Sequence, residues 1–160
     1  MALRNIVKGD DPVLRKKSRE VTAFDEKLHQ LLDDMYDTMF AANGVGLAAV
    51  QVGILRRVVV VDVGYERIEL INPVITERSE ETLSTPEACL SFPGQCGMVE
   101  RPVKVTVQAL DRNGDPISVD GDDLLARAIC HELDHLDGVI YQDIATQMLE
   151  AEEDCDSEDR

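Results

Sequence analysis

The chain has 160 residues, of which 44% are hydrophobic and only 4% aromatic, and its formal net charge is -16. This size and composition predict one globular domain with a largely aliphatic core. An excess of 32 acidic over 16 basic residues argues against sequence-independent nucleic-acid binding and against electrostatic attachment to a membrane, because both rely on basic patches.

The sequence also indicates the cellular compartment of the protein and the extent of its folded domain. The start lacks the apolar run of a secretory signal, and no segment approaches the roughly 18 apolar residues of a membrane span. We therefore expect a cytoplasmic protein whose four cysteines are free or metal-bound. The acid-rich residues 149–160 are expected to form a disordered tail, which leaves residues 1–148 as the single folded domain.

The first predicted element is a helix over residues 25–42. Apolar residues recur there at three- and four-residue spacing, and Asn43-Gly44 is typical of a helix end. The small residues that follow, up to Gln51, let backbone approach a ligand or a neighbouring segment closely. A simple packing turn explains them equally well, but the Gln51 amide could donate to a developing oxyanion.

Three runs rich in β-branched residues predict strands in the middle of the chain, followed by a hairpin. The runs cover residues 56–63, 68–76 and 103–110. Asn113-Gly114 predicts the hairpin turn, and residues 117–119 are expected to form the returning strand. Such consecutive strands, without alternating helices, favour an α+β fold.

A helix ending near Gly138 carries the most informative motif, HExxH. His131 and His135 are four residues apart, so on a helix both imidazoles lie on one face and can bind one metal ion. Glu132 projects about 100° away around the helix axis, so it can border that metal and move protons without ligating it. Two surface histidines beside a solvated glutamate are the alternative interpretation. Beyond this helix we expect a short strand or turn over residues 139–143 and a short helix over residues 144–152.

Two histidines leave such a metal one ligand short. Catalytic sites usually have three protein ligands and one open position, and no histidine follows His135. The third ligand must therefore be sought upstream. Cys89, in an irregular loop or short strand between two prolines, would by default be a buried, inert thiol. Beside an incomplete two-histidine site, however, its thiolate would complete the ligand set.

Three stretches of the chain resemble the motifs of the peptide deformylases in order and in spacing. GxGLAAxQ is matched over Gly44 to Gln51, EGCLS over Glu87 to Ser91, and HExDHLxG over His131 to Gly138. The resemblance covers most of residues 5–145. It is far more specific than HExxH alone.

Two positions depart from the family pattern. Ala88 stands where glycine is usual, and its methyl group could crowd a substrate or strain the loop if that position needs a positive φ. Cys130 precedes His131 where many members have glutamine. Neither change touches an expected ligand or Glu132, so activity is expected.

The resemblance implies an α+β fold in which mixed, mainly antiparallel strands pack around a central helix that carries HExxH. It also implies a metal site made by Cys89, His131 and His135, with water as the fourth ligand. The ion would be Fe(II) natively, with zinc or nickel in purified protein.

The activity implied by the resemblance is removal of the formyl group from the N-terminal formylmethionine of new polypeptides, with release of formate. Glu132 would be the general acid and base, and Gln51 with the backbone N–H of Leu90 would stabilise the oxyanion. The remaining implied residues would contact the substrate: Gly44, Val45, Gly46, Ala88, Arg127 and Ala128.

The implied partners are formylated nascent chains and, transiently, the ribosome, with no specific nucleic acid and no membrane. Two other interpretations stay open. An HExxH zinc endopeptidase would share the helix but take its third ligand from downstream. A catalytically silent metal-binding relative would keep the site without turnover.

Overall fold

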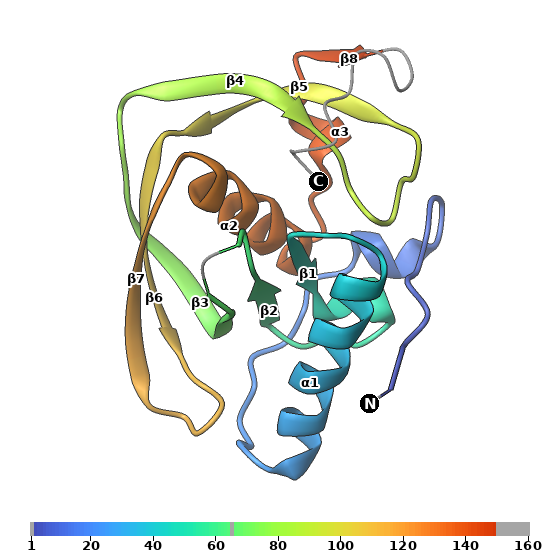
Figure 1. Ribbon diagram of the computed structural model, residues 1–160, viewed down its shortest axis with the longest axis vertical. Helices are drawn as coiled ribbons and strands as arrows, with labels where there is room; N and C mark the ends of the chain where they lie inside the picture. The colour runs from blue at the N-terminus through green and yellow to red at the C-terminus, as the bar shows by residue number, and fades with distance from the viewer. Residues whose placement is uncertain (1, 65, 150–160) are drawn as a thin grey trace.

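The computed structural model describes residues 2–64 and 66–149 and has an α+β architecture of two sheets and associated helices (Figure 1). Every pair of neighbouring strands in the two sheets is antiparallel. Among the described residues, none of the helices combines the length and the apolar character needed to cross a bilayer.

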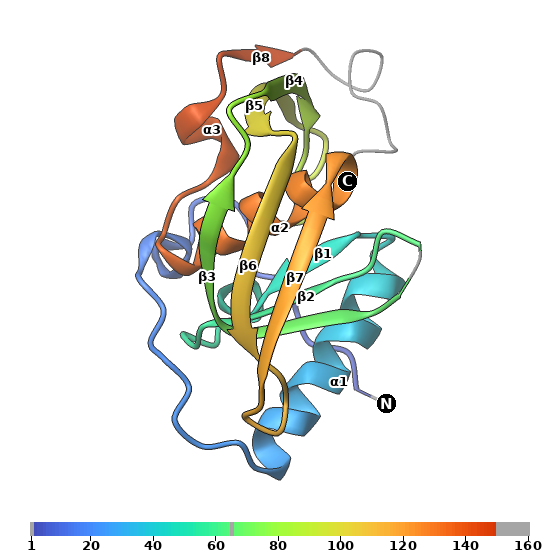
Figure 2. The ribbon, with the colours of Figure 1, turned by 90° about the vertical axis from the view of Figure 1, so that its left-hand side faces the viewer.

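The larger sheet has five strands in the order β1-β2-β3-β6-β7. Their bounds are Gly46–Ala48, Val58–Val61, Ile68–Arg78, Lys104–Leu110 and Pro116–Asp122. Asn113-Gly114 lies in the turn between β6 and β7, as the hairpin prediction required. Figure 2 shows β3, β6 and β7 as long neighbouring strands that leave the plane of β1 and β2.

The smaller sheet has three strands in the order β4-β5-β8. Their bounds are Thr82–Glu87, Cys96–Pro102 and Gln147–Leu149. The sequence did not predict β1, β5 or β8. Only the end of β4 falls in the segment that was expected to be an irregular loop or a short strand. The smaller sheet matters for the site because the chain leaves β4 directly into the Cys89 loop.

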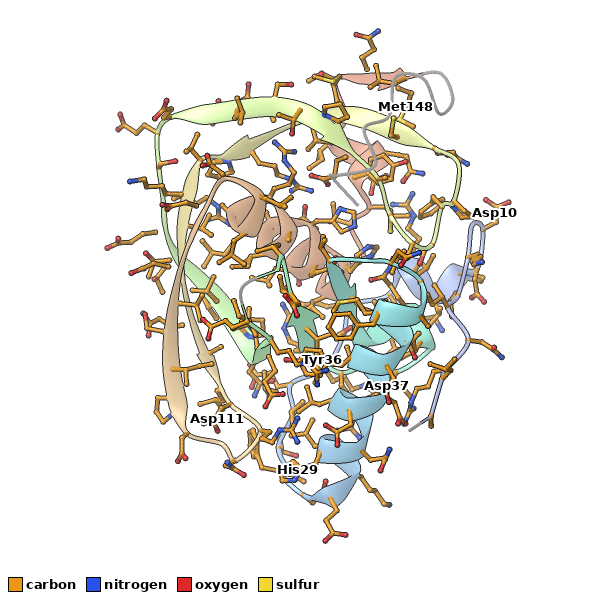
Figure 3. The ribbon with its side chains drawn as sticks, in the orientation of Figure 1. Asp10, His29, Tyr36, Asp37, Asp111 and Met148 are labelled. Atoms are coloured by element: carbon orange, nitrogen blue, oxygen red, sulfur yellow. The ribbon has the colours of Figure 1, made fainter. Side chains whose placement is uncertain are left out.

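Helix α1 (Glu26–Ala41) confirms the first predicted element. Its cap is Asp25, whose carboxylate accepts the Leu28 N–H at 3.1 Å. The buried face of α1 packs on the larger sheet around Leu32, Met35 and Met39. The third histidine, His29, lies on α1 far from the other two and points toward the β6–β7 turn near Asp111 (Figure 3), where its Nε2 lies 2.8 Å from the carbonyl of Arg112.

Helix α2 (Asp123–Leu136) carries the HExxH motif and contacts strands of both sheets. One face buries Ala126, Ile129 and Leu136 against the larger sheet. This burial sets the orientation of the helix. Its polar face is therefore directed toward β4 and β5. Gly138 follows with φ +76°, and an added Cβ there would lie 2.4 Å from the Arg15 carbonyl oxygen.

Three expectations need correction. The segment expected to be a strand or turn contains most of a short helix, α3 (Tyr141–Ile144). The helix expected over 144–152 is wrong where the structure describes it, because residues 147–149 pair with β5 as β8. Cys96 is disulfide-bonded, so not all cysteines are free or metal-bound, although Cys89 and Cys130 are free thiols. The acidic tail beyond residue 149 lies outside the described residues.

Candidate metal centre and active site

A thiol and two imidazoles converge on one buried point. Cys89 enters from the loop after β4, and His131 and His135 come from successive turns of α2. The Nε2 atom of His135 lies 3.3 Å from Cys89 Sγ and 3.2 Å from His131 Nε2. The three ligand atoms all lie within 4.8 Å of one another, an arrangement that could hold a metal ion.

The donor set and its surroundings fit a divalent metal. Two imidazoles and a thiolate are the ligands that zinc, iron and nickel accept. The ring of His135 is 1% exposed, and its Nδ1 has no hydrogen-bond partner among the described residues. Burial and the neighbouring positive charge of His131 lower the pKa of His135 well below its ordinary value, so this ring is neutral and its Nε2 is free to ligate.

Glu87 fixes the orientation of His131. The Nδ1–H of His131 donates to Glu87 Oε2 at 2.7 Å, so the opposite nitrogen, Nε2, is the one directed at the convergence point. Burial alone would raise the pKa of Glu87, but hydrogen bonds and charges from His131 and Arg101 hold it well below its usual range. Glu87 is therefore a permanent carboxylate in a site that is nearly closed to water.

Two arginines hold the Glu87 carboxylate in turn. Arg101, from β5, donates to both Glu87 oxygens at 3.1 and 2.6 Å and to Asp134 Oδ2 at 2.7 Å. Arg127, from α2, donates to Glu87 Oε1 at 3.2 Å. Two carboxylates thus face two guanidinium groups, and this buried cluster balances its charge before His131 is counted.

Arg127 was expected to contact the substrate, but its head group has other partners. Its guanidinium also donates to the carbonyls of Val99 and Leu83, at 3.2 and 3.1 Å. These bonds tie α2 to β4 and β5. Only the aliphatic stem of Arg127 is left to line a pocket.

Glu132 lies beside the convergence point with an unsatisfied oxygen. Its side chain is 5% exposed, and its Oε1 has no hydrogen-bond partner among the described residues. Burial raises the pKa of Glu132 to about 7, against the opposing charge of His131. Both protonation states are therefore accessible near neutral pH, which suits a group that accepts and returns a proton.

The glycines of the first motif leave room for this chemistry. A Cβ added at Gly46 would lie 2.7 Å from Glu132 Oε2, and one added at Gly44 would lie 2.6 Å from Leu90 Cδ1. A side chain at Gly46 would displace the Glu132 carboxyl group, and one at Gly44 would displace the Leu90 side chain. Gly46 thus permits the close approach of β1 to α2, and Gly44 leaves room for Leu90.

Gln51 presents its amide nitrogen to the site. The Ala48 N–H donates to Gln51 Oε1 at 2.9 Å, which fixes which end of the amide points inward. Gln51 Nε2 then lies 3.1 Å from Ser91 Oγ and 3.5 Å from Cys89 Sγ. The N–H of Leu90, on the same loop, has no hydrogen-bond partner among the described residues.

A cavity of about 320 Å³ opens beside the metal group, and Ala88, Cys89 and Leu90 form part of its wall. Ala88 is not among the residues with positive φ, so its methyl group does not strain the backbone. Of the other residues expected to bind substrate, Val45 and Ala128 pack in or against the apolar core under α2. These two and both motif glycines lie outside the wall of this cavity.

Sequence reasoning missed Arg101 and Tyr141. Arg101 is 5% exposed within β5, and an arginine among apolar strand residues was the available signal for a buried charge partner. Tyr141 is 1% exposed, and its ring stacks on His131 with centroids 6.1 Å apart. No sequence pattern pointed to Tyr141, because α3 was not predicted.

A thiol and two imidazoles around one point, with a buried carboxyl group and two hydrogen-bond donors beside them, define a metal-dependent hydrolase of the HExxH type. A sequence model described as polypeptide deformylase matches residues 3–151. The chain belongs to the peptide deformylase family.

Individual relatives agree with this assignment. The chain is 52% identical over 153 residues to a peptide deformylase of Acetivibrio thermocellus, covering 96% of this chain and 89% of that relative. It is 54% identical over 143 residues to one of Alkaliphilus metalliredigens, covering 89% and 97%. The crystal structure of a peptide deformylase from Thermotoga maritima superimposes with a TM-score of 0.89 at 40% identity, covering 91% and 99%.

Proposed function

We propose that this chain is a metal-dependent hydrolase that removes the formyl group from the N-terminal formylmethionine of newly made polypeptides and releases formate. Family membership gives the reaction class. The observation that carries the proposal is the convergence of Cys89 Sγ, His131 Nε2 and His135 Nε2 within 4.8 Å, beside the unsatisfied carboxyl group of Glu132.

The chain's own residues divide the work. Cys89, His131 and His135 would hold a divalent ion, which when bound supplies Lewis-acid polarisation of the formyl oxygen and of water. Glu132 accepts a proton from the attacking water and delivers it to the amine nitrogen as the carbon–nitrogen bond breaks. Gln51 Nε2 and the Leu90 N–H are the donors for the negative charge that develops on the formyl oxygen.

The wider setting is proposed with the reaction. Fe(II) is the native ion in this proposal, with zinc or nickel able to take the same ligands. The substrate is a formylated nascent chain, so the protein acts in the cytoplasm in transient association with the ribosome. The substrate approaches over Gly44, Val45, Gly46 and Ala88, and it also meets Ala128 and the aliphatic stem of Arg127, both on α2. Residues 1–148 serve as one catalytic domain.

Formate release from formyl-Met-Ala-Ser by the Fe(II)-loaded protein under anaerobic conditions tests the proposal. We expect Glu132→Gln to lower kcat by at least about 100-fold while the metal content stays the same, because the amide cannot carry the proton. Glu100→Gln is the matched control, since Glu100 is exposed on β5 and should leave kcat unchanged. Near-native turnover in Glu132→Gln would reject the assigned role.

The same protein separates the two other interpretations. Cys89→Ala should lose the metal and all turnover, whereas a zinc endopeptidase with a downstream ligand would keep both. Cleavage of an unformylated peptide at an internal bond would favour the endopeptidase. Absence of formate release above the Glu132→Gln level would favour a silent relative.

A further inference from the structure

The N-terminal segment forms one wall of the cavity beside Cys89. The segment runs alongside α1 toward the loop tip at Asp10 (Figures 1 and 3). It is tied to the site by two backbone hydrogen bonds, from the Val7 N–H to the Gln51 carbonyl at 2.7 Å and from the Gly9 N–H to the Ser91 carbonyl at 2.9 Å. Lys8 lies between these two anchors, so its backbone is held at a fixed distance from both motif loops.

Lys8 contributes the one charged side chain among the described residues that line this cavity. It is exposed and makes no ion pair with any described residue, so its ammonium charge is not neutralised. The next acids along the chain, Asp10 and Asp11, do not line this cavity. They line a neighbouring hollow that meets it at Phe92 and Gln95, and the Asp11 carboxylate accepts the Val13 N–H at 3.0 Å.

A second hollow continues the cavity outward. It has a volume of about 570 Å³, runs between the N-terminal segment and the end of α1, and shares Ile6, Lys8 and Ala42 with the first. Its other charged residue is Arg4, which is already paired with Asp34 at 2.9 Å. No carboxylate lines either hollow in the described part of the chain, although acids outnumber bases two to one overall (32 against 16).

The charge lining the two hollows bears on which substrates the enzyme prefers. Resting on the proposed function, we propose that the two joined hollows receive the substrate residues that follow the formylated one, and that Lys8 makes the enzyme prefer acidic side chains there. The formyl end is held at the metal group, so the rest of the peptide must leave past the Cys89 loop. The wall it meets on this path carries one unpaired positive charge.

Paired peptides that differ only in charge test this preference. The two peptides are Met-Ala-Glu-Glu and Met-Ala-Gln-Gln, both amidated at the C-terminus. Their formylated forms are used to measure kcat/KM. Their unformylated forms are used to measure equilibrium binding by competition. We expect a two- to five-fold preference for the acidic peptide at low salt, about the strength of an exposed ion pair, and its loss near 0.5 M salt through screening. The difference should lie in KM rather than kcat.

Variants assign the effect to one side chain. Lys8→Gln should abolish the preference and Lys8→Glu should invert it. Lys17→Glu is the matched control, because Lys17 is exposed on the same N-terminal region but lines neither hollow. A preference that Lys8→Glu leaves unchanged, or that Lys17→Glu changes equally, overturns the inference.

Failure of the proposed function would look different. If no variant released formate from either formylated peptide, the reaction assigned above would be wrong. The binding ratio of the two unformylated peptides, and its response to Lys8→Glu, would still decide the role of Lys8.

Discussion

The two faces of α2 are held by different forces. The face toward the larger sheet is apolar and buries side chains such as Ile129 and Leu136 completely. The face toward β4 and β5 is polar and is held by the ion cluster of Glu87, Arg101 and Arg127. Apolar packing fixes the position of the helix, whereas directional hydrogen bonds fix the side-chain orientation of His131.

The substitution with the largest expected effect removes Arg101, which lies at the centre of the ion cluster. Arg101→Leu should lower the free energy of unfolding by about 3–5 kcal/mol, because it removes the guanidinium that pairs with both Glu87, which is buried, and Asp134, which is partly buried. Urea denaturation measures the change. Arg78→Leu, at an exposed position on β3, should shift the same quantity by less than about 0.5 kcal/mol. A loss below about 1 kcal/mol for Arg101→Leu would mean that the cluster contributes little.

A gentler change keeps the shape of the cluster and removes one charge. Glu87→Gln can still accept the His131 Nδ1–H bond, but the acceptor is neutral, so the imidazole becomes a weaker ligand. We expect metal affinity, measured by competition with a chelator, to fall about 10- to 100-fold. Unchanged affinity would show that the geometry of Glu87, and not its charge, is what His131 requires.

The apolar face offers the opposite test. Ile129→Val removes one buried methylene group and should cost about 0.5–1.5 kcal/mol of unfolding free energy. Metal affinity should stay within about twofold, since the backbone of α2 remains in place. A fall in affinity as large as that of Glu87→Gln would show that the two faces are not independent.

The smallest effect belongs to an ion pair away from either face. Burial alone would raise the pKa of Asp143, but hydrogen bonds from Arg15 and from the Ile140 N–H lower it overall. A lowered folded-state pKa adds stability above the unfolded value near 3.9 and loses it as pH falls through the folded value. The deficit of Asp143→Asn, at most about 1 kcal/mol at pH 7 because the pair is solvent-screened, should therefore shrink below about pH 4. A deficit that is as large at pH 2 as at pH 7 would point to lost packing.

The predictable parts of the fold were those with a strong internal pattern. Apolar periodicity located α1 to within a residue or so at each end, and β-branched runs located β2, β3 and β6. Strands β5 and β8 lack such a pattern, since residues 96–102 mix glycine, charge and proline and residues 147–149 are too few. They are strands because of what they pair with, which a local pattern does not contain.

The residues of the candidate site were likewise only partly predictable from the sequence. The i, i+4 spacing of His131 and His135 predicted one shared face, and the structure brings Cys89 to it. Arg101 could not be placed, because its contact with Glu87 depends on the antiparallel register of β4 and β5, in which Glu87 lies opposite Gly97. That register follows from tertiary pairing and not from the motif.

The hairpin made by β4 and β5 has a consequence for anyone who wishes to retune the metal centre. Glu87, which orients the ligand His131, is the last residue of β4, and the ligand Cys89 follows two positions later. A change in the conformation of this hairpin therefore moves both groups at once. Laboratory evolution aimed at a different ion would therefore do better to randomise this hairpin as a block than to vary single positions along it.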